Sequence, residues 1–184
     1  MRITGGRLAG RSVRCPDGII RPAMDSMRES VFAVLRGELP GAAFLDLFSG
    51  SGIVGLEAWS RGAASVVMVE KDAGKKRILA ENAALAEGAA RVHIMPVERY
   101  IKFVKAGPFD IVFLDPPFSY RFKGQLLRML AASSLLAEGG QVLIHHPRED
   151  ELPEDIPGLA RTGLRVYGRS RVGFYRRGGS PAAP

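Results

Sequence analysis

A strand, a glycine loop and the start of a helix follow one another in one segment, Phe44-Leu45-Asp46-Leu47-Phe48-Ser49-Gly50-Ser51-Gly52-Ile53-Val54-Gly55. Its last six residues match Gly-x-Gly-x-x-Gly, a pattern typical of loops that receive a nucleotide-like cofactor. Glycine lets the backbone turn sharply and approach a ligand, and the helix start offers unpaired N–H donors. Alone the pattern is weak, because tight structural turns match it as well.

Strand and helix patterns alternate on both sides of this segment. Strands are expected at residues 43–48, 65–69, 92–95, 109–114 and 141–145, and helices at 53–61, 73–87, 98–105 and 122–132. A further helix is expected to start at a capping box of Ser26 and Glu29 and to end at Pro40, with Met27, Val31, Val34 and Leu35 on one face. The segments 159–167 and 171–175 are typical of an antiparallel hairpin. This order predicts an α/β fold with a doubly wound, mostly parallel sheet and a terminal antiparallel hairpin.

The composition is that of a soluble globular protein with one main domain. The chain has 184 residues, of which 46% are hydrophobic and 24% charged. No apolar run reaches the roughly 18 residues of a membrane helix, and no secretory signal follows Met1. The single cysteine fits a reducing compartment, so we expect a cytoplasmic protein. We also expect a monomer, a basic extension over residues 1–22 with a small hairpin at 2–14, a main domain over 23–177 and a disordered tail over 178–184.

The net charge of +7 is concentrated at the two ends of the chain. The basic residues there are arginines: Arg2, Arg7, Arg11, Arg14 and Arg21 near the start, and Arg161, Arg165, Arg169, Arg171, Arg176 and Arg177 near the end. Clustered arginine favours a polyanionic partner such as nucleic acid. The plainer alternative is a solubilising surface on a basic protein.

Two carboxylates strengthen the prediction of a cofactor site. Glu70 ends the second predicted strand, about 20 residues after the loop, where a carboxylate can accept hydrogen bonds from ribose hydroxyls. Asp46 lies inside a buried strand and therefore requires an ammonium or backbone-amide partner. The alternative for Asp46 is a satisfied structural carboxylate. These features also suit NAD, but the sequence offers no convincing site for a hydride acceptor.

A tetrapeptide after the fourth predicted strand, Asp115-Pro116-Pro117-Phe118, indicates chemistry on an amino group. Asp115 and the Pro116 carbonyl can each accept a hydrogen bond from one amine proton, and the prolines add no competing N–H donor. Phe118 can stack on an extruded base. The C-terminal edge of a doubly wound sheet is where ligands bind, which favours this interpretation over a simple strand-ending turn. Together with the cofactor loop, the tetrapeptide predicts methyl transfer to the exocyclic amine of a nucleobase.

From Arg2 to about Tyr175 the chain resembles the bacterial family of 16S rRNA guanine-N2 methyltransferases of the small ribosomal subunit. The resemblance is carried by residues 2–6, 10–11, 21–32 and 45–58 and by the tetrapeptide. It implies a class I S-adenosylmethionine-dependent methyltransferase fold, S-adenosylmethionine as methyl donor, and 16S rRNA or the assembling small subunit as partner. The tetrapeptide alone is shared with adenine and cytosine amino-methyltransferases.

The resemblance also implies roles for individual residues. It assigns the cofactor to Asp46, Phe48, Gly50, Ser51, Gly52, Glu70, Val97 and Glu98. It assigns RNA contacts to Arg2, Arg7, Arg11, Arg14, Arg21 and Arg28.

The chain departs from the family pattern at Ala23, Ser26, Ser49 and the pair His145-His146. No constellation of carboxylates or cysteines is expected around the two histidines, so no metal site is expected. Two alternatives stay open: an amino-methyltransferase acting on adenine N6 or cytosine N4 of DNA or RNA, and a non-catalytic RNA-binding assembly factor that keeps the fold.

Overall fold

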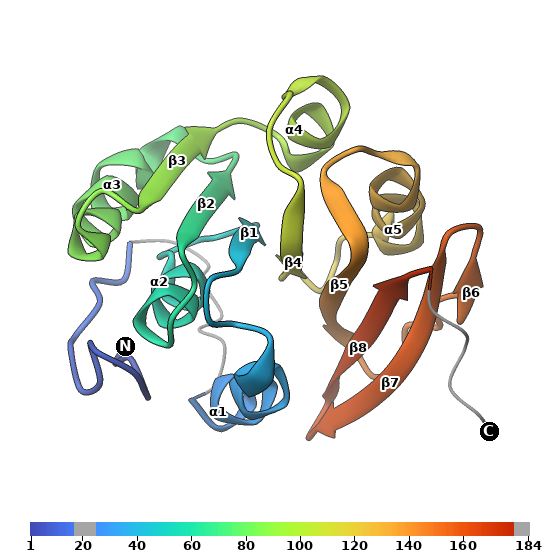
Figure 1. Cartoon of the computed structure of the whole chain (residues 1–184), viewed down its shortest axis with the longest axis horizontal. Helices are drawn as coiled ribbons and strands as arrows, with labels where there is room; N and C mark the ends of the chain where they lie inside the picture. Colours follow the sequence, from blue (N-terminus) through green and yellow to red (C-terminus); the bar gives the residue numbers. More distant parts are fainter. Residues whose placement is uncertain (17–24, 179–184) are drawn as a thin grey trace. The chain divides into compact units, whose positions relative to one another are not determined.

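Alternating strands and helices build two structural units, Met1–Pro96 and Val97–Pro184, in the computed structural model (Figure 1). The structure describes residues 1–16 and 25–178. The boundary predicted between residues 22 and 23 lies outside the described residues, as do Arg21, Ala23 and the predicted tail beyond residue 178.

The first unit contains three parallel strands in the spatial order β3-β2-β1. They are β1 (Ala43–Leu47), β2 (Ser65–Glu70) and β3 (Ala90–Ile94). The helices are α1 (Asp25–Val34), α2 (Ile53–Ser60) and α3 (Lys76–Ala83), with 3-10 turns η1 (Leu35–Gly37), η2 (Ala73–Lys75) and η3 (Ala84–Ala86). Leu47 pairs with Val69, so the loop after β1 and Glu70 emerge at the same edge of these strands.

The first helix differs from its prediction in three respects. It begins at Asp25, so Ser26 lies inside the helix and is not its N-cap. Met27, Val31 and Leu35 are buried as predicted, whereas Val34 is 38% exposed and Arg28 takes a place in the interior. The helix also ends before Pro40, because the chain tightens into η1 at Leu35.

The second unit contains α4 (Val97–Phe103), β4 (Phe109–Leu114), α5 (Lys123–Ala132), β5 (Leu136–Pro147), β6 (Asp155–Ile156), β7 (Leu159–Tyr167) and β8 (Ser170–Arg177). Its strands follow the order β4-β5-β8-β7-β6. Strands β4 and β5 are parallel, and β5, β8, β7 and β6 pair antiparallel. Figure 1 shows β7 and β8 side by side as the predicted terminal hairpin.

These elements confirm the α/β class, the parallel pairing and the terminal hairpin. Strand β6 was not predicted, and β5 starts five residues before its predicted bound. The N-terminal hairpin has one antiparallel bridge between Arg2 and Ser12 instead of two strands. In the described ranges, no helix has the length and apolar character needed to cross a membrane.

Candidate active site

The loop after β1 takes a conformation that few residue types tolerate. Gly50 has a φ of 55° and Gly52 a φ of 78°, and Phe48 adopts a φ of 67° although it is not a glycine. A bulky residue held in this region marks local strain, which tends to occur where function requires it. A Cβ on Gly50 would meet no atom within 4 Å, whereas one on Gly52 would lie 2.8 Å from Leu79. Gly52 therefore serves packing as well, while the surroundings of Gly50 leave room for a ligand.

The buried carboxylate of Asp46 joins β1 to the next helix. Its Oδ2 accepts a hydrogen bond of 3.0 Å from the backbone N–H of Gly55. A Cβ on Gly55 would come within 2.8 Å of Val66 and 3.2 Å of Asp46, so only glycine lets α2 approach β1 and β2 this closely. The backbone-amide partner predicted for Asp46 is present, and this contact also fits a structural role.

The carboxylate of Glu70 fixes the glycine loop against the end of β2. Its Oε2 accepts from the Gly50 N–H at 3.0 Å, and its Oε1 accepts from the Asp72 N–H at 2.9 Å. Lys75 Nζ lies 3.8 Å from Oε1. Because each carboxylate oxygen has two lone-pair positions, both retain acceptor capacity for further hydroxyl donors.

Asn82 on α3 links the glycine loop to the N-terminal segment, which sequence reasoning did not identify. Its side chain is 3% exposed. The amide Nδ2 donates to the carbonyls of Ser51 at 2.8 Å and Arg14 at 2.9 Å, and Oδ1 accepts from the Arg14 N–H at 3.2 Å. A lone asparagine in an amphipathic helix gives no signal in the sequence, because its partners are 31 and 68 residues away.

The tetrapeptide in the second unit starts directly after β4. The Asp115 side chain is 22% exposed, so its carboxylate is directed neither fully into the interior nor fully into solvent. The Pro117 carbonyl is taken by the Tyr120 N–H in a turn. Among the described residues, no hydrogen bond reaches the Pro116 carbonyl or Asp115 Oδ2. Both oxygens are therefore available as acceptors for an amine.

His145 on β5 is the partner of Asp115, a contact that the sequence analysis did not identify. Its Nδ1 lies 2.8 Å from Asp115 Oδ1. The neighbouring His146 is buried, its Nδ1 lies 2.8 Å from the Pro147 carbonyl, and burial lowers the pKa of its imidazole. A signal for the contact existed in the sequence, since Asp115 and His145 both follow apolar runs that form neighbouring parallel strands.

Two further side chains, those of Lys123 and Tyr120, shape the segment after the tetrapeptide. The buried ammonium of Lys123 donates to the carbonyls of Phe118 at 2.8 Å and Tyr120 at 2.6 Å, and pairs with Asp150 at 2.7 Å. The Tyr120 hydroxyl donates to Glu98, a predicted cofactor residue; burial first, and then this carboxylate, raise the pKa of Tyr120. Val97, the other residue predicted at the adenine, is 2% exposed.

The N-terminal segment is docked on the end of α2. The Arg7 N–H donates to the Ser60 carbonyl at 2.8 Å, and a Cβ on Gly6 would lie 1.9 Å from that same carbonyl oxygen, so the close approach requires glycine. The guanidinium of Arg7 stacks 4.5 Å from the centre of the Trp59 ring. Four predicted RNA-contacting arginines, Arg2, Arg7, Arg11 and Arg14, are exposed, and Arg14 pairs with Glu81.

Arg28 is not available for RNA, contrary to its prediction. Its side chain is 1% exposed, and its Nε donates to the fully buried Glu57 at 2.8 Å. Its NH2 group donates to Asp25 and to the Arg2 carbonyl. The physical reason is that Glu57, on the buried helix α2, requires a buried cation.

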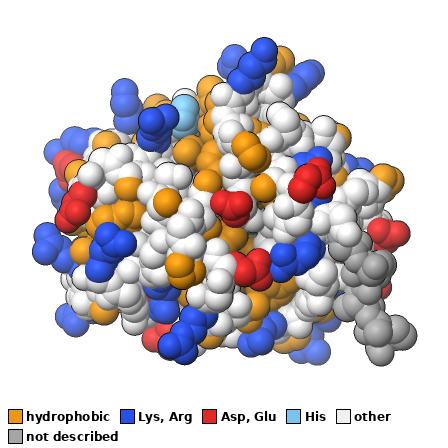
Figure 2. Space-filling model, in the orientation of Figure 1, with side chains coloured by type: hydrophobic (Ala, Val, Ile, Leu, Met, Phe, Trp, Pro, Cys, Tyr) orange, Lys and Arg blue, Asp and Glu red, His pale blue; other side chains and the backbone are white. Residues whose placement is uncertain are grey.

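The guanidinium groups of some C-terminal arginines also have partners within the fold. Arg177 donates to the carbonyls of Ala131, Ser133 and Leu136, and Arg161 pairs with Glu154. Figure 2 shows basic and acidic side chains intermixed on the visible face. Net charge at the chain ends therefore does not by itself define an RNA-binding surface.

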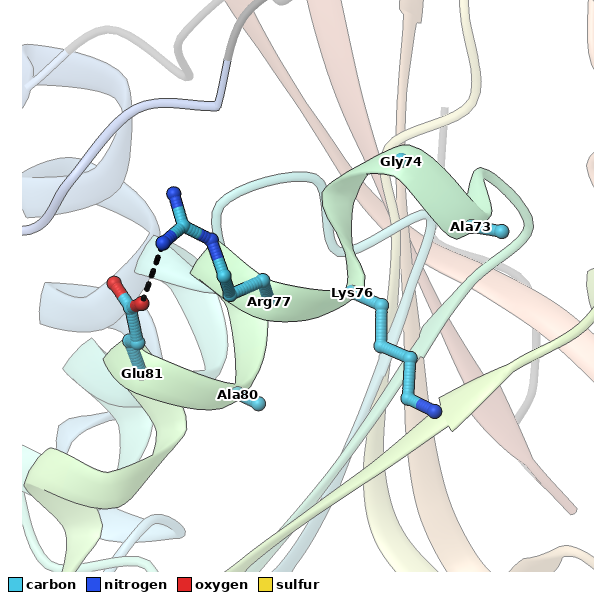
Figure 3. A pocket seen from close by; sticks show the side chains of 6 residues that line it. All are labelled: Ala73, Gly74, Lys76, Arg77, Ala80 and Glu81. Atoms are coloured by element: carbon cyan, nitrogen blue, oxygen red, sulfur yellow. Dashed lines mark ion pairs between the residues drawn. The ribbon is translucent and has the colours of Figure 1, made fainter.

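The described residues of each unit line a hollow. The first is lined by Ala73, Gly74, Lys76, Arg77, Ala80 and Glu81 at the start of α3 (Figure 3). Arg77 and Glu81 point toward each other across it as an ion pair of 3.9 Å. It includes neither the glycine loop nor Glu70. The second runs from Phe118 to Arg128 and along 150–153, next to the tetrapeptide.

The chain is similar to known proteins over almost its whole length. A family model described as "Conserved hypothetical protein 95" matches residues 1–176. The ribosomal RNA small subunit methyltransferase D of Escherichia coli (strain K12) is 36% identical over 96% of this chain and 90% of its own length. The putative rRNA methyltransferase YlbH of Bacillus subtilis (strain 168) is 33% identical over 97% of this chain and 100% of its own length.

Solved structures agree. A putative methyltransferase from Escherichia coli, yhhF, has a TM-score of 0.87 and 32% identity, with 96% of this chain and 97% of that chain covered. A putative methyltransferase complexed with SAH shares the fold, with a TM-score of 0.70 at 16% identity over 87% of this chain and 51% of that chain. The chain therefore belongs to the Conserved hypothetical protein 95 family, the methyltransferase D-like family that the sequence motifs predicted.

Proposed function

We propose that this protein transfers a methyl group from S-adenosylmethionine to the exocyclic N2 amine of a guanine in 16S rRNA. Relatives named rRNA methyltransferases support ribosomal RNA as the substrate class. The single observation that carries the amine chemistry is the partly exposed Asp115 at the start of Asp-Pro-Pro-Phe, directly after β4. We expect the protein to act in the cytoplasm and to have the assembling small ribosomal subunit as its partner.

The tetrapeptide supplies what an aromatic amine needs in order to react. The lone pair of such an amine is delocalised into the ring, which makes the nitrogen a poor nucleophile. Asp115 Oδ2 and the Pro116 carbonyl can each accept one N–H, and this localises the lone pair on nitrogen. The carboxylate also stabilises the positive charge that develops on nitrogen, while Phe118 stacks on the base.

The glycine loop fits the predicted cofactor. S-adenosylmethionine, when bound, supplies an electrophilic methyl group on a sulfonium centre. Gly50 leaves open space where any other residue would project a side chain, and Glu70 keeps acceptor capacity for ribose hydroxyls. We assign the methionine end to Asp46, Phe48, Gly50, Ser51 and Gly52, the ribose to Glu70 and the adenine to Val97 and Glu98.

The exposed arginines of the N-terminal segment are the best candidates for RNA phosphate contacts. Arg2 and Arg11 are exposed, and no ion pair to an acidic side chain is found for either within the described ranges. Arg7 keeps its exposed charge while it stacks on Trp59. Contacts of this kind position the RNA without reading its sequence.

The test is methyl transfer in vitro with nucleoside identification. Small subunits from cells that lack this gene are incubated with the protein and methyl-labelled S-adenosylmethionine, and the digested rRNA is separated by mass spectrometry. We expect label in N2-methylguanosine. Label in N6-methyladenosine or N4-methylcytidine would support the other amino-methyltransferase activity. Absence of label with retained RNA binding would support a non-catalytic assembly factor.

Calorimetry gives an independent test of the cofactor. We expect binding of S-adenosylmethionine and no binding of NAD at the same concentration. A preference for NAD would contradict the whole proposal, because the amine clamp has no role in hydride transfer.

A further inference from the structure

The Asp115 carboxylate is oriented by one side chain of the neighbouring strand. Leu114 on β4 is in register with Ile144 on β5, so Asp115, directly after β4, and His145, within β5, lie beside each other. Figure 1 shows β4 and β5 adjacent. The resulting Nδ1–Oδ1 distance of 2.8 Å is that of a good hydrogen bond.

The donor in this bond must be the imidazole, because an ionised carboxylate can only accept. Nδ1 therefore carries the proton and donates the hydrogen bond, which Asp115 Oδ1 accepts. His145 Nε2 is buried and has no hydrogen-bond partner among the described residues. A proton on Nε2 would be a buried donor without an acceptor, so the ring is best satisfied with its proton on Nδ1.

His145 also contacts the last residue of the tetrapeptide. The rings of Phe118 and His145 meet edge to face, with centroids 5.3 Å apart and planes at 70°. This is a favourable geometry for an aromatic pair. One imidazole thus holds both the carboxylate at the start of the tetrapeptide and the ring at its end.

We propose that His145 is the positioning residue of the amine site, an inference that rests on the proposed function. Its Nδ1–H donates a hydrogen bond to Asp115 Oδ1, which leaves Oδ2 to accept a hydrogen bond from the incoming amine. Its ring sets the plane of Phe118, on which the base stacks. The acceptor and the stacking platform are therefore pre-oriented relative to each other before the substrate arrives, which is how positioning contributes to rate.

Three variants separate the two contacts from simple packing. His145→Asn keeps a donor near the position of Nδ1 but removes the ring, whereas His145→Phe keeps the ring but removes the donor. His146→Asn is the matched control, because His146 is also buried on the same strand and its Nδ1 lies against the Pro147 carbonyl instead of a residue of the tetrapeptide. All are compared by kcat, by KM for each substrate and by melting temperature.

We expect His145→Phe to lose roughly 10²-fold in kcat. Its KM for S-adenosylmethionine should stay within about twofold of the wild-type value, since misorientation affects the transition state and not cofactor binding. His145→Asn should recover part of the loss, because it restores the donor and not the ring, and His146→Asn should keep wild-type kcat. The inference is overturned if His145→Phe keeps the wild-type kcat. It is also overturned if, in His145→Asn and His146→Asn alike, kcat falls only in proportion to the loss of melting temperature.

Imidazole ¹⁵N NMR tests the inference without turnover. The wild-type protein should show His145 as the Nδ1–H tautomer, and Asp115→Ala should shift the ring toward a mixture of tautomers. A wild-type ring protonated on Nε2 alone would contradict the positioning role even if methylation is observed. A correct tautomer in a protein that methylates no guanine would leave the contact intact and refute only the proposed function.

Discussion

Replacement of Asn82 by alanine should separate the glycine loop from the N-terminal segment. Asn82 makes three hydrogen bonds to the backbone: two with Arg14 and one with the Ser51 carbonyl, all between 2.8 and 3.2 Å. Ser51 lies in the loop assigned to the methionine end of the cofactor, and Arg14 lies in the segment assigned to RNA. One side chain thus supports both binding regions.

The magnitude follows from the number of bonds and from burial. A hydrogen bond contributes about 1 kcal/mol net, so three bonds amount to about 3 kcal/mol. Asn82 is 3% exposed, so water cannot easily replace the amide at the Ser51 carbonyl. The free energy of unfolding should therefore fall by about 3 kcal/mol.

Urea unfolding measures this change, and calorimetry follows S-adenosylmethionine binding in parallel. Glu81→Gln is the matched control, because Glu81 lies next to Asn82 on α3 and pairs with Arg14 on the surface. An exposed pair contributes only about 0–1 kcal/mol, so the control should change little. A loss below about 1 kcal/mol in Asn82→Ala, or unchanged cofactor affinity, would refute the reasoning that this amide supports the loop.

Three further predictions concern other parts of the molecule. Lys123→Met leaves Asp150 and two carbonyls without their cation, so the free energy of unfolding should fall by about 3 kcal/mol and turnover should fall with it. Arg128→Met on the same helix should stay near the wild type in both stability and turnover. Burial lowers the pKa of His146 from 6.5, so the unfolded state binds the proton more strongly than the folded state. The contribution of His146 to stability should therefore be fully present above pH 6.5 and should fall as the pH drops toward the lower folded pKa. A profile of melting temperature against pH that keeps this slope in His146→Asn would contradict the assignment. RNA affinity should fall with salt, and Arg11→Ala should reduce the slope of log K against log salt by roughly 0.7 to 0.9; an unchanged slope would remove Arg11 from the RNA-binding surface.

The strands and their connections could be predicted because their patterns are local. Apolar runs bounded by glycine and proline identified β1, β2 and β4 within one residue of their observed bounds. The predicted helix at 73–87 was less accurate: it divides into η2, α3 and η3, and such tightened ends depend on tertiary packing.

The side-chain partners could be predicted only where the strand order brings them together. Asp115 was identified from its motif, but its contact with His145 depends on the register between β4 and β5. Arg28 was assigned to RNA from the family resemblance, and only the fold shows that Glu57 requires it in the interior. Asn82 could not be identified, since neither its spacing nor its neighbours indicate contacts with Ser51 and Arg14.

Substitution of Asp115 by alanine tests most directly whether this carboxylate activates the amine. Methyl transfer to the small subunit and S-adenosylmethionine affinity are measured on the same preparation. We expect methylation to be abolished while the cofactor dissociation constant stays within about twofold, since the interaction is made to the reacting amine and not to the cofactor. Turnover retained in Asp115→Ala would contradict the account, because this carboxylate is the proposed acceptor for the amine.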